Sequence, residues 1–463
     1  MEQRKANANP ARAFFVRMLT RDISLEDCIL DLVDNSVDSA RTLAADHETG
    51  LSSEPTLAGY RVEITIAEDR FVIRDNCGGI SLDAAADYAF TFGRQEDAPV
   101  AETSPGGEGQ LDGSPQSSNQ IGVYGIGMKR AVFKLGNQIE IQSTYQEHPC
   151  GSLMSFMVPI DVDEWVKDPS HDWDFGIDPA DPAPDPGVEI QVHALHPSTS
   201  EKFDDPSFLI TLRRILGRTY LLPLMRGLDV VLNGKPVPAW SVEFKTSSEF
   251  APMRHSHTDD HVLIELIAGM AEAPPDVTDV PSEDTGEDVW GWYVACNGRL
   301  VLAADKTELS GWGVSFPKWH GQYAGFVGIA LFSSVDPALL PMTTTKRSVD
   351  VASGVYRRAR THMQRAARGW IDYTNERKTA LEVAHDKESQ TVPASLPDVP
   401  TREAVLLPKL ASGPPIGNIL YKRPAADIRR LAIAYGDASM PFKEVGERTF
   451  DDSFRAKIGR DSE

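Results

Sequence analysis

The sequence has few cysteines and no long apolar run. Its cysteines, Cys28, Cys77, Cys150 and Cys296, are widely spaced, and no two of them form a CxxC pair. This pattern argues against a disulfide framework and against a zinc site, and it suits a reducing compartment. No run of about eighteen apolar residues occurs, so we expect no transmembrane helix. The opening residues MEQRKANANPARAFF lack the apolar core of a secretory signal, and we expect a cytoplasmic protein.

Basic charge is also scarce. The net charge of −22 argues against a surface that coats nucleic acid. Lysine and arginine gather in residues 346–368, where a solvated helical face is the favoured interpretation and a basic patch the alternative. The histidines of RHSHTDDH, His255, His257 and His261, have no second ligand cluster, so we expect an exposed polar loop rather than a metal site.

Hydrophobic periodicity predicts the elements of the first half of the chain. Residues 24–43 have helical spacing after Ser24, a suitable N-cap, and residues 60–75 alternate like a hairpin. A polar loop at 95–120 precedes a glycine-rich turn and helix at 121–135. Three strand-like runs follow, at 137–145, 151–160 and 187–195. This order predicts an α+β sandwich with helices on one face of a mixed sheet.

The second half predicts a further domain and a helical end. A helix at 207–225 leads into DVVLNGKPVPAW, which we expect to open the second domain, and later runs predict strands, a helix at 361–383 and a linker at 389–402. The expected divisions are 1–206 for the first domain with a lid at about 95–120, 207–350 for the second, 351–388 for a helical segment, and 389–463 for a linker and a small C-terminal region of unknown role.

The segment DLVDNSVDSA, residues 31–40, lies on the first predicted helix. Asp31 and Asn35 are four residues apart and share a face. The amide oxygen of Asn35 is a suitable Mg²⁺ ligand that adds no negative charge beside a triphosphate. A carboxylate one turn earlier can orient or deprotonate a water molecule. Taken alone, the segment is better interpreted as the polar face of an amphipathic helix.

A second motif, IRDNCGGI, occupies residues 73–80. Asp75 ends a predicted strand, and its carboxylate can accept a hydrogen bond from an adenine amino group. Gly78 and Gly79 let the backbone pass close to a base. Taken alone, this motif predicts only a turn at the end of a hairpin.

A third motif, IGVYGIGMKRA, occupies residues 121–131. Gly122, Gly125 and Gly127 open a predicted helix, so backbone N–H groups and the helix dipole can face phosphate. The preceding segment is a polar loop and not a buried strand, which excludes the Rossmann version of such a glycine run.

Together, in this order and with the long loop between the second and third, the motifs resemble the GHKL ATPase superfamily. That superfamily comprises DNA gyrase B subunits, ninety-kilodalton heat-shock chaperones, MutL proteins, histidine kinases and MORC proteins. The resemblance implies a Bergerat-fold domain that binds ATP with Mg²⁺. Asn35 matches the Mg²⁺ ligand, Asp31 stands where hydrolysing members have a glutamate base, and Asp75 matches the adenine-reading aspartate, with Gly79 beside the base.

The resemblance also assigns the phosphate side of the pocket. It implies that Gly122, Gly125 and Gly127 cradle phosphate and that residues 95–120 form the lid over ATP. Lys129 is a candidate phosphate partner, with an exposed residue at a helix start as the alternative.

The chain departs from the family pattern in three places. Asp31 is one methylene shorter than glutamate, which implies slow turnover because catalysis depends steeply on distance. Cys77 replaces the first glycine of the Asp-x-Gly-x-Gly pattern, and Gly187-Val188 replaces Gly-Thr, whose hydroxyl commonly helps to hold the aspartate.

The segment LLPMTTTKRSVD, residues 339–350, is similar to the switch loop of the transducer domain in gyrase, MutL and MORC relatives. The resemblance makes Lys346 the candidate lysine that reaches the γ-phosphate, with an exposed lysine as the alternative. No histidine precedes Asp31, which argues against a sensor kinase. The resemblance is therefore closest to MORC- and MutL-like proteins with a transducer domain.

This resemblance implies an ATP-gated molecular clamp. ATP binding would close the lid and join two protomers, and hydrolysis to ADP and phosphate would reopen them. The segment ARAFFVRMLTR, residues 11–21, is a candidate strap between subunits, or else a helix packed on its own domain. The alternatives are a nucleotide-sensing module with little turnover, which Asp31 favours, and a chaperone-like ATPase acting on protein clients. DNA or protein is the expected client, without a membrane.

Overall fold

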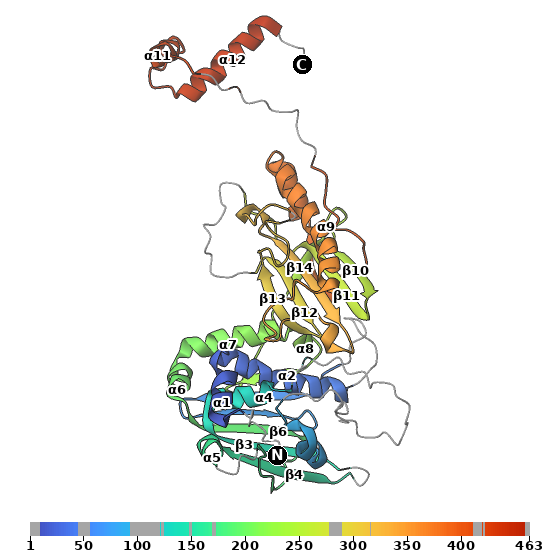
Figure 1. Ribbon diagram of the computed structural model, residues 1–463. Helices are drawn as coiled ribbons and strands as arrows, with labels where there is room; N and C mark the ends of the chain where they lie inside the picture. Colours follow the sequence, from blue (N-terminus) through green and yellow to red (C-terminus); the bar gives the residue numbers. More distant parts are fainter. Residues whose placement is uncertain are drawn as a thin grey trace, which may run out of the picture. The chain divides into compact units, whose positions relative to one another are not determined.

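The computed structural model describes residues 10–44, 56–92, 121, 125–147, 151–168, 173–276, 289–314, 316–410, 419 and 422–458 (Figure 1). The chain divides into two compact units, Met1–Leu410 and Ala411–Glu463. The predicted lid at 95–120 and Gly122 both lie outside the described residues. The functional motifs that are described all belong to the first unit.

A mixed sheet forms the first part of this unit, and its described strands run in the order β5-β4-β3-β6-β2-β1-β7-β8. Their bounds are β1 (Arg61–Ala67), β2 (Arg70–Asp75), β3 (Gly136–Gln146), β4 (Leu153–Asp161), β5 (Asp178–Pro179), β6 (Gly187–Leu195), β7 (Asp229–Leu232) and β8 (Lys235–Pro236). Neighbouring strands are antiparallel except β1 and β7. The predicted hairpin, turning at residues 68 and 69, is confirmed.

Helices α1, α2, α4 and α7 lie together on one face of this sheet (Figure 1). The helices of this part are α1 (Arg12–Arg21), α2 (Leu25–Leu43), α3 (Leu82–Ala84), α4 (Gly127–Leu135), α5 (Val162–Lys167), α6 (Pro197–Asp204), α7 (Pro206–Thr219) and α8 (Leu221–Met225). The N-cap prediction is confirmed, since the Ser24 hydroxyl accepts a hydrogen bond from Asp27 N. The structure is thus a mixed sheet with helices, as the sequence predicts.

The segment predicted to open the second domain belongs instead to the first sheet, so that prediction is wrong. Strand β7 pairs in parallel with β1, and Val230 and Leu232 are buried in the same core as Leu212 and Leu216 of α7. Apolar alternation predicts a strand but does not indicate which sheet it joins. The single predicted helix at 207–225 is also divided, into α7 and α8.

A second sheet follows, with its described strands in the order β10-β11-β14-β12-β13. The bounds are β10 (Met253–Asp259), β11 (Val262–Met270), β12 (Gly291–Cys296), β13 (Arg299–Asp305) and β14 (Phe326–Ser333). Helix α9 (Gly354–Arg377) packs on β11 and β14. A separate apolar cluster joins this sheet to α8 and to the small sheet of β9 (Glu243–Thr246) and β15 (Val392–Ser395).

The structure corrects two further predictions in this half. The predicted linker at 389–402 is folded, because β15 pairs with β9 and Leu396 and Val399 are buried. The predicted helix at 361–383 is two helices, α9 and α10 (Leu381–Ser389). In its described residues, the second unit contains the helices α11 (Ala425–Ala434) and α12 (Phe442–Ile458). Throughout the described residues, no helix is both long and apolar enough to cross a bilayer.

Candidate active site

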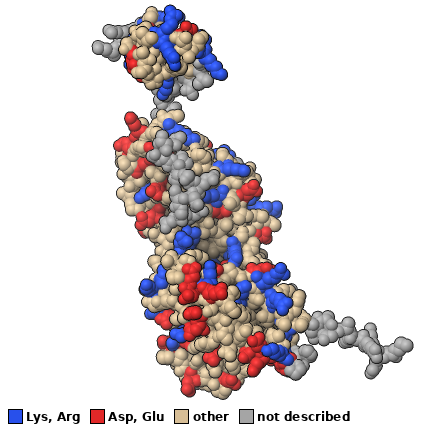
Figure 2. Space-filling model, turned by 90° about the vertical axis from the view of Figure 1, so that its left-hand side faces the viewer, with Lys and Arg blue, Asp and Glu red and all other residues tan. Residues whose placement is uncertain are grey.

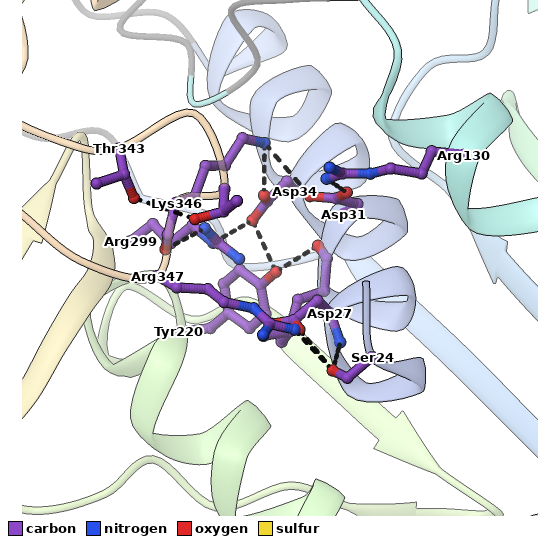
Figure 3. A network of polar contacts seen from close by, with 12 residues as sticks. Ser24, Asp27, Asp31, Asp34, Arg130, Tyr220, Arg299, Thr343, Lys346 and Arg347 are labelled. Atoms are coloured by element: carbon purple, nitrogen blue, oxygen red, sulfur yellow. Dashed lines mark hydrogen bonds and ion pairs between the residues drawn. The ribbon is translucent and has the colours of Figure 1, made fainter. Parts of the chain in front are cut away.

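Helix α2 contacts the third motif through two acidic side chains. Asp31 is buried, and its carboxylate pairs with the guanidinium of Arg130 on α4 (Figure 3). A Cβ on Gly127, the first residue of α4, would stand 3.5 Å from the Asp31 side chain, so the start of α4 lies against this acid. One helical turn beyond Asn35, Asp38 accepts a hydrogen bond from Ile121 N at 2.7 Å.

The same helix contacts the second motif. The Ser36 hydroxyl donates to Asp75 Oδ2 at 2.6 Å, while Cys77 N and Val188 N donate to Oδ1 at 2.9 and 3.2 Å. Burial raises the pKa of Asp75, and these three hydrogen bonds oppose that rise. These three hydrogen bonds hold the aspartate in a fixed orientation, although Val188 has no hydroxyl to contribute.

The glycines of the second motif are required by the fold itself. Gly78 and Gly79 have positive φ values of 108° and 74°. A Cβ on Gly79 would lie 2.0 Å from the carbonyl oxygen of Thr144 on β3. The observed close approach is therefore to a neighbouring strand. Cys77 is buried, and its burial raises the pKa of the thiol, so it acts as a small core residue.

Asn35 and Lys129 lie in contrasting environments. Asn35 is exposed on α2, one turn after Asp31, where its amide is open to a ligand. Lys129 is buried, and its ammonium donates to the carbonyl oxygens of Ala89 and Thr91 at 3.1 and 2.7 Å. Burial lowers the pKa of Lys129 to about 8. Among the described residues, no hydrogen bond or ion pair joins Lys129 to Asp31 or Asn35, and its phosphate role stays a prediction.

The loop that contains Lys346 reaches α2 from the second-sheet part of the chain. Lys346 lies in a tight turn closed by its own N–H, which donates to Thr343 O at 2.8 Å, and it has a φ of 57°. Its ammonium lies 2.8 Å from Asp34 Oδ2 and 3.8 Å from Asp31 Oδ1. The next residue, Arg347, pairs with Asp27 and donates to the Ser24 hydroxyl at 2.7 Å.

Sequence reasoning missed the acid at the centre of this network. Asp34 has no exposed surface, and Arg299 Nε and the Tyr220 hydroxyl lie 2.9 and 2.8 Å from its Oδ1 (Figure 3). Burial and the charge of Asp34 raise the pKa of Tyr220. Burial lowers the pKa of Arg299, but the nearby acidic groups of Asp34, Tyr220 and Asp31 outweigh burial and raise the pKa overall. The only sequence signal was that Asp34 falls inside the first motif.

The residues present suit the predicted ligands. Asp75 is an oriented carboxylate for a donor such as an adenine amino group, and Asn35 supplies an exposed neutral oxygen for Mg²⁺. Gly125 has a φ of 65° just before the first turn of α4, whose N–H groups can face an anion. Together, these groups can accommodate a nucleotide with its metal ion.

A comparison with known families agrees with this assignment. Residues 23–171 match the model of a family described as histidine kinase-, DNA gyrase B-, and HSP90-like ATPase. Domains of this GHKL class bind ATP, usually with Mg²⁺. The match includes α2, Asp75 and α4 and ends before the second sheet and Lys346. No curated protein matches the sequence of the chain.

Proposed function

We propose that the chain binds ATP with Mg²⁺ and hydrolyses it to ADP and phosphate. The observation that carries this proposal is that separate parts of the sequence converge on α2. The contacts are Ser36 with Asp75, Asp31 with Arg130, and Asp34 with Lys346. Within the matched segment, the first two contacts join motifs of the ATPase family, and the third brings in a cation from a loop far along the chain.

Each residue in the pocket has a separate role in this proposal. Asp75 accepts the adenine amino hydrogen, Asn35 holds the Mg²⁺, and the start of α4 with Gly125 and Gly127 faces the phosphates. Bound Mg²⁺ neutralises phosphate charge. Asp31 orients the attacking water and takes its proton. Lys346 stabilises the charge that develops on the transferred phosphoryl group.

The contact between Lys346 and Asp34 supports a switching role. The ammonium of Lys346 neutralises the buried acid Asp34, and a γ-phosphate would compete with Asp34 for this cation. The loop would then shift and carry the second sheet with it, as in a transducer-like domain. We further propose that ATP-bound protomers form a dimeric clamp, with DNA or protein as the client.

One observation favours a second candidate, a nucleotide sensor with little turnover. The carboxylate of Asp31 is paired with Arg130 and is shorter than the glutamate of hydrolysing relatives. A base held in an ion pair is less available to accept a proton from water. In this alternative, ATP binding changes the conformation and hydrolysis is rare.

Steady-state hydrolysis and nucleotide binding by purified variants test both functions. We expect Asp31→Asn to retain ATP binding and to lose turnover by about a hundredfold or more, because it removes the base. Asn35→Ala should lose Mg²⁺-dependent binding, and Lys346→Ala should lower turnover with a small effect on affinity. The matched control is Asp69→Asn in the hairpin turn, at the opposite end of β2 from Asp75.

The results separate the candidates. If the wild type hydrolyses ATP and Asp31→Asn does not, the ATPase proposal stands. If the wild type binds ATP and does not turn it over, the sensor is correct. Absence of ATP binding in the presence of Mg²⁺ would contradict both.

A further inference from the structure

A cleft of about 480 Å³ lies between α7, the start of α2, strand β13 and the Lys346 loop. It is lined by Asp27, Leu30, Thr211, Arg214, Ile215, Arg218, Thr219, Arg299, Leu300, Val301, Leu302, Ala303, Lys346 and Arg347. Within the first unit, the space-filling surface is hollowed near its middle, and Lys and Arg side chains border the hollow (Figure 2). None of the residues assigned to adenine, Mg²⁺ or water lines this cleft, although Lys346 reaches it.

The cleft is basic in a protein that is strongly acidic. Its lining holds five cations and a single acid, whereas the whole chain has a net charge of −22. Arg299 and Lys346 share Asp34, Lys346 also lies near Asp31, and Arg347 pairs with Asp27, so three acids lie against cations of the lining. Because Asp27 is the only one of these acids in the lining, the lining itself carries a net positive charge. Such a concentration attracts anions and raises their local concentration.

Helix α7 contributes a single stripe to the cleft. Thr211, Arg214, Ile215 and Arg218 are spaced at i, i+3, i+4 and i+7 and therefore share one face. Arg214 and Arg218 are like charges four residues apart, an arrangement that destabilises an isolated helix slightly. By contrast, the neighbouring Arg213 points elsewhere and donates to the carbonyl oxygens of Leu232, Lys235 and Pro236. The two arginines of this stripe repel each other and so do not stabilise the helix, but both are placed to bind an anion.

The rest of the lining fits a ligand that is larger and more apolar than a simple anion. Leu30 and Ile215 face residues 300–303, which are apolar throughout, and Thr211 and Thr219 add hydroxyl groups. A volume of this size is within the usual range for a small-molecule site. Phosphate oxygens would pair with the arginines while an attached apolar group packs on the aliphatic wall. A small organic phosphate fits this combination.

We propose that the cleft binds a small phosphorylated molecule with an apolar part, which regulates the Lys346 loop. Arg347 lines the cleft and also clamps Ser24 and Asp27 at the start of α2. A bound phosphate competes with Asp27 for Arg347 and so loosens the loop from α2. The regulatory half of this proposal rests on the proposed ATPase function, whereas the binding half does not.

The binding test uses phenyl phosphate and inorganic phosphate as probes, titrated by calorimetry into the full-length protein without Mg²⁺. We expect phenyl phosphate to bind about tenfold more tightly than inorganic phosphate, because the aliphatic wall covers its ring. Arg214→Glu should weaken both by about tenfold or more, since it reverses an exposed cation of the cleft. Thr211→Glu is a second variant with the same expectation. Arg70→Glu, in the β1–β2 hairpin, is the charge-matched control and should have no effect.

Equal affinities in Arg214→Glu and Arg70→Glu would overturn the binding site. Loss of phenyl phosphate binding in Asn35→Ala would also overturn it, because the probe would then occupy the nucleotide pocket. Binding of a single-stranded oligonucleotide that depends on Arg214, with neither probe binding, would contradict a small-molecule occupant. If the probes bind but do not alter ATP turnover in an active wild type, the regulatory half is wrong. A protein without ATPase activity can still pass the binding test, so the two proposals can fail separately.

Discussion

At the scale of single residues, the buried charge of Asp34 controls how the Lys346 loop meets α2. Its carboxylate is shared by Arg299, Lys346 and Tyr220, each from a different element. Removal of one partner from a buried ion pair leaves uncompensated charge, which costs about 3 kcal/mol or more. We expect Asp34→Asn to lower the free energy of unfolding by about that amount in urea titrations.

The matched control for this prediction is Asp69→Asn. Asp69 is 75% exposed in a hairpin turn, so its loss should change stability by less than about 0.5 kcal/mol. If the two variants unfold at the same urea concentration, the Asp34 network contributes little, and the loop is held by other contacts.

The residues of the network differ in how far the sequence could reveal them. Asp31, Asp75 and Lys346 stand in motifs with recognisable local chemistry, and the structure places Asp31 and Lys346 near one another. Arg130 falls inside the third motif, but nothing in the sequence indicates that it pairs with Asp31, and Tyr220 lies outside all three motifs. Their importance depends on tertiary contacts between distant segments, which local patterns do not encode.

At the scale of elements, α2 depends on its first turn. Ser24 caps the helix and also accepts a hydrogen bond from Arg347. We expect Ser24→Ala to lower the free energy of unfolding by about 1 kcal/mol, the usual effect of losing an N-cap, in thermal or urea unfolding. Ser24→Asp preserves an acceptor and should recover most of this loss. An equal loss in both variants would show that the cap is not the cause.

Helix α9 and the edge strand β10 join through a histidine cluster, where the sequence predicted an exposed loop. His255 and His257 lie on β10, and the ring of His362 lies 5.4 and 5.1 Å from theirs. No group of His, Cys, Asp or Glu that could hold a metal ion occurs among the described residues. The exposed-loop prediction is therefore wrong for His255 and His257, because alternate residues of a strand point toward α9, whereas His261 does lie in an exposed turn.

This cluster predicts acid sensitivity. Burial, then the charge of His255, lowers the pKa of His257, with Asp259 opposing. Burial, then the nearby histidines and Arg365, lowers the pKa of His362, with Glu403 opposing. Both folded-state pKa values lie below the unfolded value of about 6.5, so the unfolded chain binds more protons there and stability falls as the pH drops below that value.

The test is the unfolding midpoint measured between about pH 5 and pH 7.5, a range that brackets the unfolded histidine pKa. His257→Gln with His362→Gln should flatten the loss of stability at low pH. His261→Gln, at an exposed turn position, should retain the wild-type slope. If the double variant keeps that slope, other groups cause the acid sensitivity.

The elements themselves were predicted unevenly, and the reason is physical. The predictions of long periodic segments such as α2 and the β1–β2 hairpin were correct, because each element has a continuous apolar face that its sequence period reveals. The sheet membership of β7 and the folding of residues 392–395 depended on pairing with distant strands. Helix α12 was missed because its apolar residues are largely exposed, which leaves no clear buried face to detect.

At the scale of the whole molecule, the division after Leu410 predicts an independent C-terminal unit. Helices α11 and α12 have a small core of their own, made of Ala432, Met440 and Val445. All the residues proposed to bind or hydrolyse ATP precede Leu410. We therefore expect a chain ending at residue 410 to retain the ATP affinity and turnover of the full-length protein.

Measurement of ATP turnover by both chains, with nucleotide-dependent dimerisation followed by size-exclusion chromatography, checks this expectation. Equal turnover with loss of DNA or protein binding would assign client recognition to the C-terminal unit. A truncated chain that folds, as judged by an unchanged main unfolding transition, but does not hydrolyse ATP would contradict the independence of the two units. In that case residues beyond 410 would act on the Lys346 loop or the nucleotide pocket directly, and the ATPase would have to be understood as a property of the entire chain.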